Sequence, residues 1–324
     1  MTAEIVELTD ATTGSTAEIA VNLGFNCYRF RAADANRGAG PPIEVLHSHP
    51  EFTAGGQRPS GSGIPILFPF PGRIPGTTFA WQGRSYELEP GDPLGNAIHG
   101  FVLRRPWRVI EQRADRVVGQ FHAWQDDPGL RDRWPADFRI TATYSLAKGT
   151  LRMHYRIENP CEVDLPCGLG THPYFRLPLG GPAADDCLVR LPVTARWELN
   201  QMLPTGHRLE LDDAAAYRAG RRFGELVLDD VFTGLAFEQG RFAAAIDDPA
   251  AGRSVGIRFD ATFPHCVVYT PPHRTAICIE PYSCVPGGFA LAASRPELGL
   301  RIVPPGAQFE ATVEISCRMV DPQN

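Results

Sequence analysis

Alternation of apolar and polar residues is the strongest regular pattern along the chain. Between residues 138 and 146, apolar side chains occupy every second position, with polar ones between them. Because successive side chains of a strand point to opposite faces of its sheet, this period of two predicts a half-buried strand. The pattern resumes over residues 151–157 after Ala147-Lys148-Gly149, so the two segments are predicted to form a hairpin. Residues 309–317 alternate in the same way and predict a strand near the C-terminal end.

Shorter apolar segments between turn residues indicate further strands. The chain has 32 glycines and 30 prolines, and only residues 212–218 and 289–293 have a helix-like pattern. Many short strands separated by turns favour a sandwich over alternating strands and helices. The sequence therefore predicts an all-β fold, a large antiparallel β-sandwich with few short helices. The shorter predicted strands are residues 17–23, 27–31, 107–111, 117–124, 187–193, 235–238, 242–247, 254–259, 266–270 and 276–280.

Composition is that of a folded globular protein. Hydrophobic residues make up 43% of the 324 residues and charged residues 21%, which excludes a largely disordered chain. No low-complexity linker, charge block or fixed-period repeat divides the sequence. Residues 1–324 are therefore predicted to form a single domain.

Charge and cysteine usage narrow the range of partners. The net charge is −6, with acids and bases spread along the chain, so no basic stripe predicts nucleic-acid binding. No apolar run reaches the roughly 20 residues that cross a membrane, and the N-terminal residues lack the pattern of a secretory signal. These observations predict a cytoplasmic protein. Its eight cysteines are then expected to be reduced, and their spacing indicates no structural metal site.

Two segments break the strand pattern around single basic residues. Residues 63–74 form an apolar run whose three prolines bar it from a central strand, and Arg73 stands near its end. Residues 96–101 place His99 beside a glycine in an apolar setting. A buried loop with a solvated arginine, and a core histidine, are the structural alternatives to a functional role.

Two more segments place a titratable residue directly before a proline. His172 lies between glycines and aromatic residues, and Pro173 biases it toward an extended conformation. Glu280 ends an apolar strand and precedes Pro281. Because burying an unpaired carboxylate is costly, Glu280 is expected to be partnered, to face water, or to line a cavity where its pKa is useful.

Taken in order, PILFP…GRI, IHGF, THPYF and CIEPY resemble the aldose 1-epimerase, or galactose mutarotase, family. Residues 228–235 resemble an Asp-Asp segment that the family carries between its second histidine and its glutamate. The resemblance implies a large β-sandwich that binds a small-molecule sugar and needs no cofactor.

The resemblance also implies a role for each matching residue. His172 matches the acid that protonates the ring oxygen, and Glu280 matches the base. His99 and Arg73 match hydrogen-bonding residues near the ring, and Asp230 matches an acceptor of a sugar hydroxyl, with Asp229 adjacent. Besides these residues, Tyr174 is a candidate for the apolar face on which a pyranose stacks, together with Phe70, Phe175 and Tyr282.

Anomer interconversion explains why a histidine and a glutamate would be needed. The C1 hydroxyl must lose a proton while the ring oxygen gains one, so that the ring opens to an aldehyde, rotates and closes on its other face. This chemistry requires an acid and a base with suitable pKa values, and neither a metal nor a nicotinamide. The predicted function is therefore an aldose 1-epimerase acting on a hexose.

Departures from the family pattern leave the substrate open. Gly72, Gly100-Phe101 and Pro281-Tyr282 differ from the better-known mutarotases, and the His-Gly-Phe form also occurs in a branch resembling hexose-6-phosphate epimerases. That alternative would need a phosphate site, and a non-catalytic carbohydrate-binding module is the alternative from another class. A glycosidase fits less well, because it usually needs two carboxylates. Arg104, Arg105 and Arg176 are candidates for a phosphate site, and solvated surface charges are the favoured interpretation of them. His47 and His49 form a partial metal-site pattern, but no third ligand is recognisable, so surface histidines are the favoured interpretation.

Overall fold

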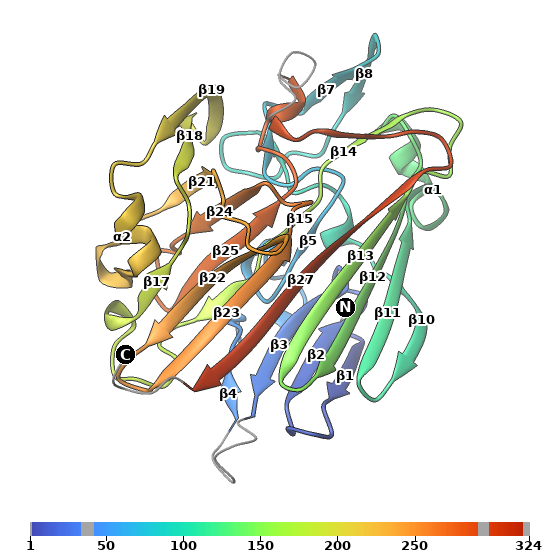
Figure 1. Cartoon of the computed structure of the whole chain (residues 1–324). Coiled ribbons are helices and arrows are strands. Elements are labelled where there is room, and N and C mark those ends of the chain that lie inside the picture. The colour runs from blue at the N-terminus through green and yellow to red at the C-terminus, as the bar shows by residue number, and fades with distance from the viewer. Residues whose placement is uncertain (1, 34–41, 291–297, 320–324) are drawn as a thin grey trace.

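The computed structural model confirms the predicted fold class, since the chain is built mainly from antiparallel strands (Figure 1). It describes residues 2–33, 42–290 and 298–319. Within these ranges no helix is long and apolar enough to span a membrane. The described residues include two short α-helices, α1 (Ala123–Asp126) and α2 (Ala214–Ala219).

One large sheet has nine strands and contains the regular alternating segments of the sequence. The predicted hairpin is present, and its turn residues Lys148 and Gly149 both have positive φ, as a two-residue hairpin turn requires. In Figure 1, β27 (red) joins the green strands to the orange ones. The strands in spatial order are β10 (Arg108–Arg113), β11 (Arg116–His122), β12 (Arg139–Ala147), β13 (Thr150–Glu158), β27 (Gln308–Met319), β23 (Arg253–Asp260), β22 (Arg241–Asp248), β17 (Leu188–Arg190) and β20 (Arg221–Arg222).

The second large sheet has eight strands and is less regular. Several of its strands have only two or three residues, because prolines interrupt the segments that form them. Its strands are β19 (Leu203–Glu210), β18 (Ala195–Asn200), β21 (Asp229–Thr233), β24 (His265–Tyr269), β25 (Ala276–Tyr282), β15 (Gly170–Thr171) and β5 (Ile66–Leu67), with β16 (Tyr174–Arg176) also pairing with β25.

Smaller sheets and turns complete the described structure. A four-stranded sheet contains β1 (Ile5–Thr9), β2 (Thr16–Ala20), β3 (Asn26–Ala32) and β4 (Ile43–Glu44). The two-stranded pairs are β14 (Leu165–Cys167) with β26 (Arg301–Val303), β6 (Arg73–Ile74) with β9 (Ala97–Ile98), and β7 (Thr78–Trp81) with β8 (Arg84–Glu87). The short 3-10 helices are Phe52–Ala54, Pro59–Gly61, Val102–Arg104, Pro128–Asp132, Ala184–Asp186, Phe223–Glu225 and Gly288–Ala290.

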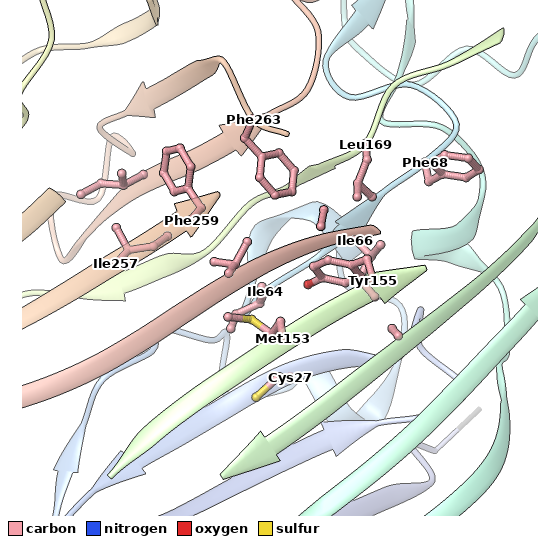
Figure 2. Close-up of a cluster of buried hydrophobic side chains, with 14 of the residues drawn as sticks. Cys27, Ile64, Ile66, Phe68, Met153, Tyr155, Leu169, Ile257, Phe259 and Phe263 are labelled. Atoms are coloured by element: carbon pink, nitrogen blue, oxygen red, sulfur yellow. The ribbon is translucent and has the colours of Figure 1, made fainter. Parts of the chain in front are cut away.

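The core lies where side chains of the two large sheets meet. Met153 and Tyr155 of β13 and Phe259 of β23 are fully buried, and so are Ile66 of β5 and Leu169. Figure 2 shows these side chains gathered in one cluster between the ribbons. Burying each large apolar side chain contributes about 1.5–3 kcal/mol. The apolar side chains at alternate positions of β13 and β23 therefore pack the nine-stranded sheet against the eight-stranded sheet.

Two local expectations differ from the structure. Residues 235–238 are not a strand, because Gly234 (φ 64°) and the Gln239-Gly240 turn confine them to a short connection whose Ala236 N–H donates to Pro192. The β18–β19 hairpin was not predicted, because its turn lacks the usual glycine. The predicted helix at 212–218 corresponds to α2. The one at 289–293 extends outside the described residues.

Candidate active site

Strand register brings His172 and Glu280 together on one face of the eight-stranded sheet. Side chains two residues apart on a strand share a face, and directly opposite residues on paired strands have Cβ atoms about 4.5–5.5 Å apart. Continuing the register of the flanking pairs places His172 opposite Glu280. Those flanking pairs between the β15–β16 segment and β25 are Gly170 with Tyr282 and Tyr174 with Cys278.

The two side chains form a close, buried pair. His172 Nε2 lies 3.3 Å from Glu280 Oε1, and the side chains are only 8% and 1% exposed. The backbone N–H of His172 donates to the carbonyl of Pro65. Pro173 has no N–H with which to pair with β25, so the ladder is interrupted beside the histidine. The pair lines a cavity of about 180 Å³.

Burial controls the charge of the Glu280 carboxyl group. Its Oε2 has no hydrogen-bond partner among the described residues. Burial raises the pKa of Glu280 well above its usual value, the charge of Asp229 adds to this, and a hydrogen bond from Tyr282 and the charge of Arg73 oppose it. The protonated carboxyl is therefore favoured in the free protein.

His172 is held in place by an aromatic ring and is also shifted toward its neutral form. The ring of Tyr174 stacks on the imidazole at 4.7 Å between centroids, with 3° between the planes. Burial lowers the pKa of His172 to about 3. With Glu280 shifted in the opposite sense, the proton of the pair is favoured on the carboxyl rather than on the imidazole. Moving the carboxyl proton of Glu280 across the 3.3 Å to His172 Nε2 would convert the neutral pair into an ion pair.

His99 is a neutral hydrogen-bond donor beside His172. Its ring centroid is 5.6 Å from that of His172. The Gly72 N–H donates to His99 Nδ1 at 3.2 Å, and because a backbone N–H can only donate, the neutral ring carries its proton on Nε2. Burial lowers the pKa of His99 well below its usual value, and the positive charge of Arg73, or of His172 when it is protonated, lowers it further. The backbone of His99 has φ 67°, a conformation more common at functional sites than elsewhere.

Arg73 is oriented by an aspartate that the sequence did not single out. Its Nε donates to Asp92 Oδ2 at 2.8 Å, and this leaves the Nη donors to face other groups. The buried Asp92 carboxylate also accepts from the backbone N–H groups of Leu94 and Asn96. Both Arg73 and Asp92 line the cavity. The only sequence signal for Asp92 was a Gly-Asp-Pro turn pattern, which is common in surface loops.

The structure favours Asp229 over Asp230 as the acidic residue of the cavity. Asp229 and Val231 line the cavity, whereas Asp230 lies on the opposite face of β21 and accepts from Arg196 Nη1 at 2.7 Å. Strand alternation makes two adjacent aspartates point to opposite faces, so only Asp229 of the two faces the cavity. The Asp229 side chain is exposed to the cavity. The protein around the cavity partly desolvates its carboxyl group, and this desolvation raises the pKa of Asp229.

The predicted aromatic residues divide between the cavity and the core. Tyr174 and Tyr282 line the cavity, and Tyr174 covers one face of His172. Phe70 and Phe175 are buried outside the lining. Apolar lining residues that the sequence did not predict include Met202, Leu199 and Val267.

The other candidate residues do not line this cavity. Arg105 is paired with Glu89 and Asp127, and neither Arg104 nor Arg176 belongs to the lining. His47 stacks on His273 at 4.7 Å, while His49 Nδ1 accepts from the Glu51 N–H. The one described cluster with three potential metal ligands is instead His172, Cys278 and Glu280, whose ligand atoms lie within 4.8 Å of one another.

Comparison with known proteins places these features in a family. A family model of aldose 1-epimerase matches residues 51–316. Galactose mutarotase of Sus scrofa is 22% identical over 305 residues, covering 87% of this chain and 83% of that protein. The uncharacterized protein YphB of Escherichia coli K12 is 29% identical over 112 residues, which cover 34% of this chain but only 36% of that protein.

A solved structure shows the same fold over the whole length. A galactose mutarotase-like protein from Clostridium acetobutylicum superposes with a TM-score of 0.84 at 20% identity, and 98% of this chain and 99% of that chain are covered. The matched range includes Arg73, His99, His172 and Glu280. The chain belongs to the aldose 1-epimerase family.

Proposed function

We propose that this protein interconverts the α and β anomers of a hexose, with Glu280 and His172 as the acid–base pair. The observation that carries the proposal is the 3.3 Å separation of His172 Nε2 and Glu280 Oε1 in a buried position at the cavity. A hemiacetal has both reacting oxygens on one carbon, so its acid and base must be neighbours. A pair in direct contact meets this requirement.

Ring opening begins from the ionised form of the pair. Glu280 takes the proton of the C1 hydroxyl while His172 gives its proton to the ring oxygen, and the bond between C1 and the ring oxygen breaks. Sugar hydroxyls that donate to the carboxylate favour this ionised form, as Arg73 and Tyr282 already do. After opening, Glu280 is protonated and His172 is neutral.

Ring closure reverses these transfers on the other face of the aldehyde. Rotation about the C1–C2 bond presents that face, the C5 hydroxyl attacks C1, and its proton goes to His172. Glu280 returns its proton to the aldehyde oxygen. Both residues recover their starting states, and no proton is exchanged with the medium. Burial favours the neutral pair, which is the protonation state of His172 and Glu280 while the sugar is in its open-chain form.

Three further side chains are suited to hold the sugar. Arg73 presents Nη donors whose orientation Asp92 fixes, and His99 presents an Nε2–H next to His172. Asp229 lines the cavity as an acceptor for sugar hydroxyls. Together they fix which sugar oxygens face His172 and Glu280.

The geometry favours a hemiacetal substrate over a glycoside. Glycosidases place two carboxyl groups about 5–9.5 Å apart, on either side of the bond they cleave. Here the close pair combines a carboxyl group with an imidazole. Of the two other lining carboxylates, Asp92 is committed to Arg73, and Asp229 is assigned to bind sugar hydroxyls.

A phosphorylated hexose is a second candidate, which one cavity residue favours. Arg58 lines the cavity, and among the described residues its guanidinium donates one hydrogen bond, to the carbonyl of Gly91. A guanidinium that has no acidic partner within the described part of the chain is suited to a phosphate group.

Exchange spectroscopy on purified protein tests the proposal. NMR saturation transfer between the two anomeric protons is measured for glucose, galactose and their 6-phosphates, with and without the protein. We expect exchange faster than in buffer for at least one sugar, and a preference for the 6-phosphates would select the second candidate. Sugar binding without faster exchange would identify a non-catalytic carbohydrate-binding module and overturn the proposal.

A further inference from the structure

Cys278 lies beside the proposed acid–base pair without lining the cavity. It is two residues from Glu280 on β25, so both side chains point to the same face of the sheet. Its thiol, a His172 ring nitrogen and a Glu280 oxygen lie within 4.8 Å of one another, and all three residues are buried. The cluster therefore brings nitrogen, sulfur and oxygen donors to one point.

The spacing of these donors approaches that of a tetrahedral zinc site. Zinc bonds of about 2.0–2.1 Å to nitrogen or oxygen and 2.3 Å to sulfur imply ligand atoms about 3.3–3.6 Å apart. His172 Nε2 and Glu280 Oε1 already have this separation, at 3.3 Å. The thiol needs to approach by at most about 1.3 Å from the 4.8 Å limit of the cluster.

Charge balance also suits a soft divalent cation. Binding Zn²⁺ would release the thiol proton of Cys278 and the carboxyl proton of Glu280, and neutral His172 would bind through nitrogen. Two negative ligands around a doubly charged ion make the buried site neutral, which limits the cost of its burial. Glu280 Oε2 has no partner among the described residues, so binding an ion through this carboxylate breaks no hydrogen bond at that oxygen. Mg²⁺ prefers six oxygen ligands and does not match this set.

We infer that His172, Cys278 and Glu280 form a Zn²⁺ site, and that bound Zn²⁺ blocks anomer exchange. The ion would occupy both groups that transfer protons, and its fourth coordination position would face the cavity. The inhibitory role rests on the proposed function, whereas the binding of Zn²⁺ does not. Cys278 has no part in the proposed proton transfers, and this site gives it a role.

Metal binding is tested directly on the full-length protein after removal of bound metals with a chelator. Co²⁺ serves as a spectroscopic probe for the Zn²⁺ site, because a thiolate ligand gives it an intense charge-transfer absorption. We expect this band in the unsubstituted protein, and we expect Zn²⁺ to abolish it. In Cys278→Ser the band should be absent, and the Zn²⁺ affinity, measured by competition with a chromogenic chelator, should fall at least about 10-fold.

Two further variants keep the binding test decisive. Cys187→Ser removes another buried thiol, directly before β17 of the nine-stranded sheet, and should retain both the band and the affinity. Cys278→Ala checks that the serine hydroxyl is not itself a ligand or a source of misfolding. An equal affinity in unsubstituted protein and Cys278→Ser, or no thiolate band at any Co²⁺ concentration, would overturn the site.

Inhibition is measured by anomer exchange at increasing Zn²⁺, relative to the metal-free rate of each variant. We expect Zn²⁺ to suppress exchange, EDTA to restore it, Mg²⁺ to have no effect, and Cys278→Ser to need at least about 10-fold more Zn²⁺. A protein that exchanges anomers but does not bind Zn²⁺ would remove this inference alone. A protein that binds Zn²⁺ through Cys278 but exchanges no sugar would instead remove the proposed function.

Discussion

Two histidine–glutamate pairs join neighbouring strands at the same distance but in opposite surroundings. His172 Nε2 and Glu280 Oε1 are 3.3 Å apart in the eight-stranded sheet, and His154 Nε2 and Glu310 Oε2 are 3.3 Å apart in the nine-stranded sheet. The first pair is 8% and 1% exposed, and the second is 33% and 52% exposed. Residue type and distance are therefore shared, and only the environment differs.

In the proposed reaction, burial distinguishes the His172–Glu280 pair (the inner pair) from the His154–Glu310 pair (the outer pair), because contact between the two residues is common to both. Water stabilises the charged forms of the outer pair and weakens the attraction between them. Burial opposes charge on the inner pair, so the two groups compete for one proton across a short distance. The outer pair lies among other ion pairs on the exposed face of its sheet, such as Arg139 with Glu158.

Replacing one member of each pair gives the largest expected effect. His172→Gln or Glu280→Gln should reduce the rate of anomer exchange by about 10²–10⁴-fold, because each removes the acid or the base from the proposed reaction. His154→Gln and Glu310→Gln are the matched controls and should leave the rate within about 2-fold, because an exposed ion pair is worth at most about 1 kcal/mol. Saturation-transfer NMR measures all four rates.

The double variant tests whether the inner pair acts as a unit. His172→Gln combined with Glu280→Gln should be no slower than the slower single variant, because residues that act together are not additive. A normal rate in Glu280→Gln, or an equal loss in Glu310→Gln, would contradict the contrast between the two pairs.

A second buried carboxyl group separates the effect of burial from the effect of hydrogen bonding. The Asp10 carboxyl group is also shielded from water, at 3% exposure, but it is less deeply enclosed than Glu280, and its oxygens accept from the N–H and hydroxyl of Thr12, the hydroxyl of Thr13 and the N–H of Gly149. Burial opposes ionisation of Asp10, yet these donors together lower its pKa below 3.8. Several hydrogen-bond donors therefore hold the Asp10 carboxylate in its ionised form. Glu280 has fewer donors, and its protonated form is favoured.

Asp10→Asn should accordingly destabilise the fold by about 1–3 kcal/mol at pH 7, because it removes the charge that four donors stabilise. Since the folded-state pKa is lowered, ionised Asp10 contributes its stability above the unfolded-state pKa, and this contribution is lost as the pH falls through the folded-state pKa. Urea unfolding of Asp10→Asn and the unsubstituted protein should show a difference at pH 7 that shrinks below pH 3.8. A pH-independent difference would contradict this assignment.

Neighbouring aspartates on β21 offer the next comparison. Asp229→Asn should raise the KM for the sugar about 10-fold, which corresponds to about 1.4 kcal/mol and to the loss of one hydrogen bond to a charged group. Asp230→Asn should leave KM unchanged, because its carboxylate faces Arg196 on the other side of the sheet. Steady-state exchange rates at several sugar concentrations distinguish the two. The reverse result would restore the assignment that the sequence resemblance implied.

The sequence predicts the strands of the nine-stranded sheet better than those of the eight-stranded sheet. Strands β12, β13 and β27 were predicted because one face of the nine-stranded sheet is buried and the other is solvated, which makes the residues alternate. Strands β5 and β15 were not predicted, because two residues cannot show a period. The segments that break the pattern instead revealed the candidate site.

Residues whose position depends on tertiary contacts could not be predicted. His172 and Glu280 were prominent because each precedes a proline in an apolar segment. The assignment of Asp229 or Asp230 depends on strand register, which the adjacent aspartates leave ambiguous. Asp92 and Met202 reach the cavity from a turn and a hairpin whose placement no local pattern encodes.

The turn of the β18–β19 hairpin gives the smallest expected effect and the finest comparison. Gln201 and Met202 both have positive φ, at 49° and 66°, where a side chain is strained and glycine is not. Of these two residues, only Met202 lines the cavity.

Gln201→Gly and Met202→Gly should each stabilise the fold by about 0.5–1 kcal/mol, because relief of strain exceeds the added entropy of the unfolded chain. Met202→Gly alone should raise KM, by about 3–5-fold, because it removes apolar contact with the sugar. Thermal unfolding and exchange kinetics measure both quantities. A KM increase in both variants would mean that turn geometry, rather than the Met202 side chain, shapes the cavity.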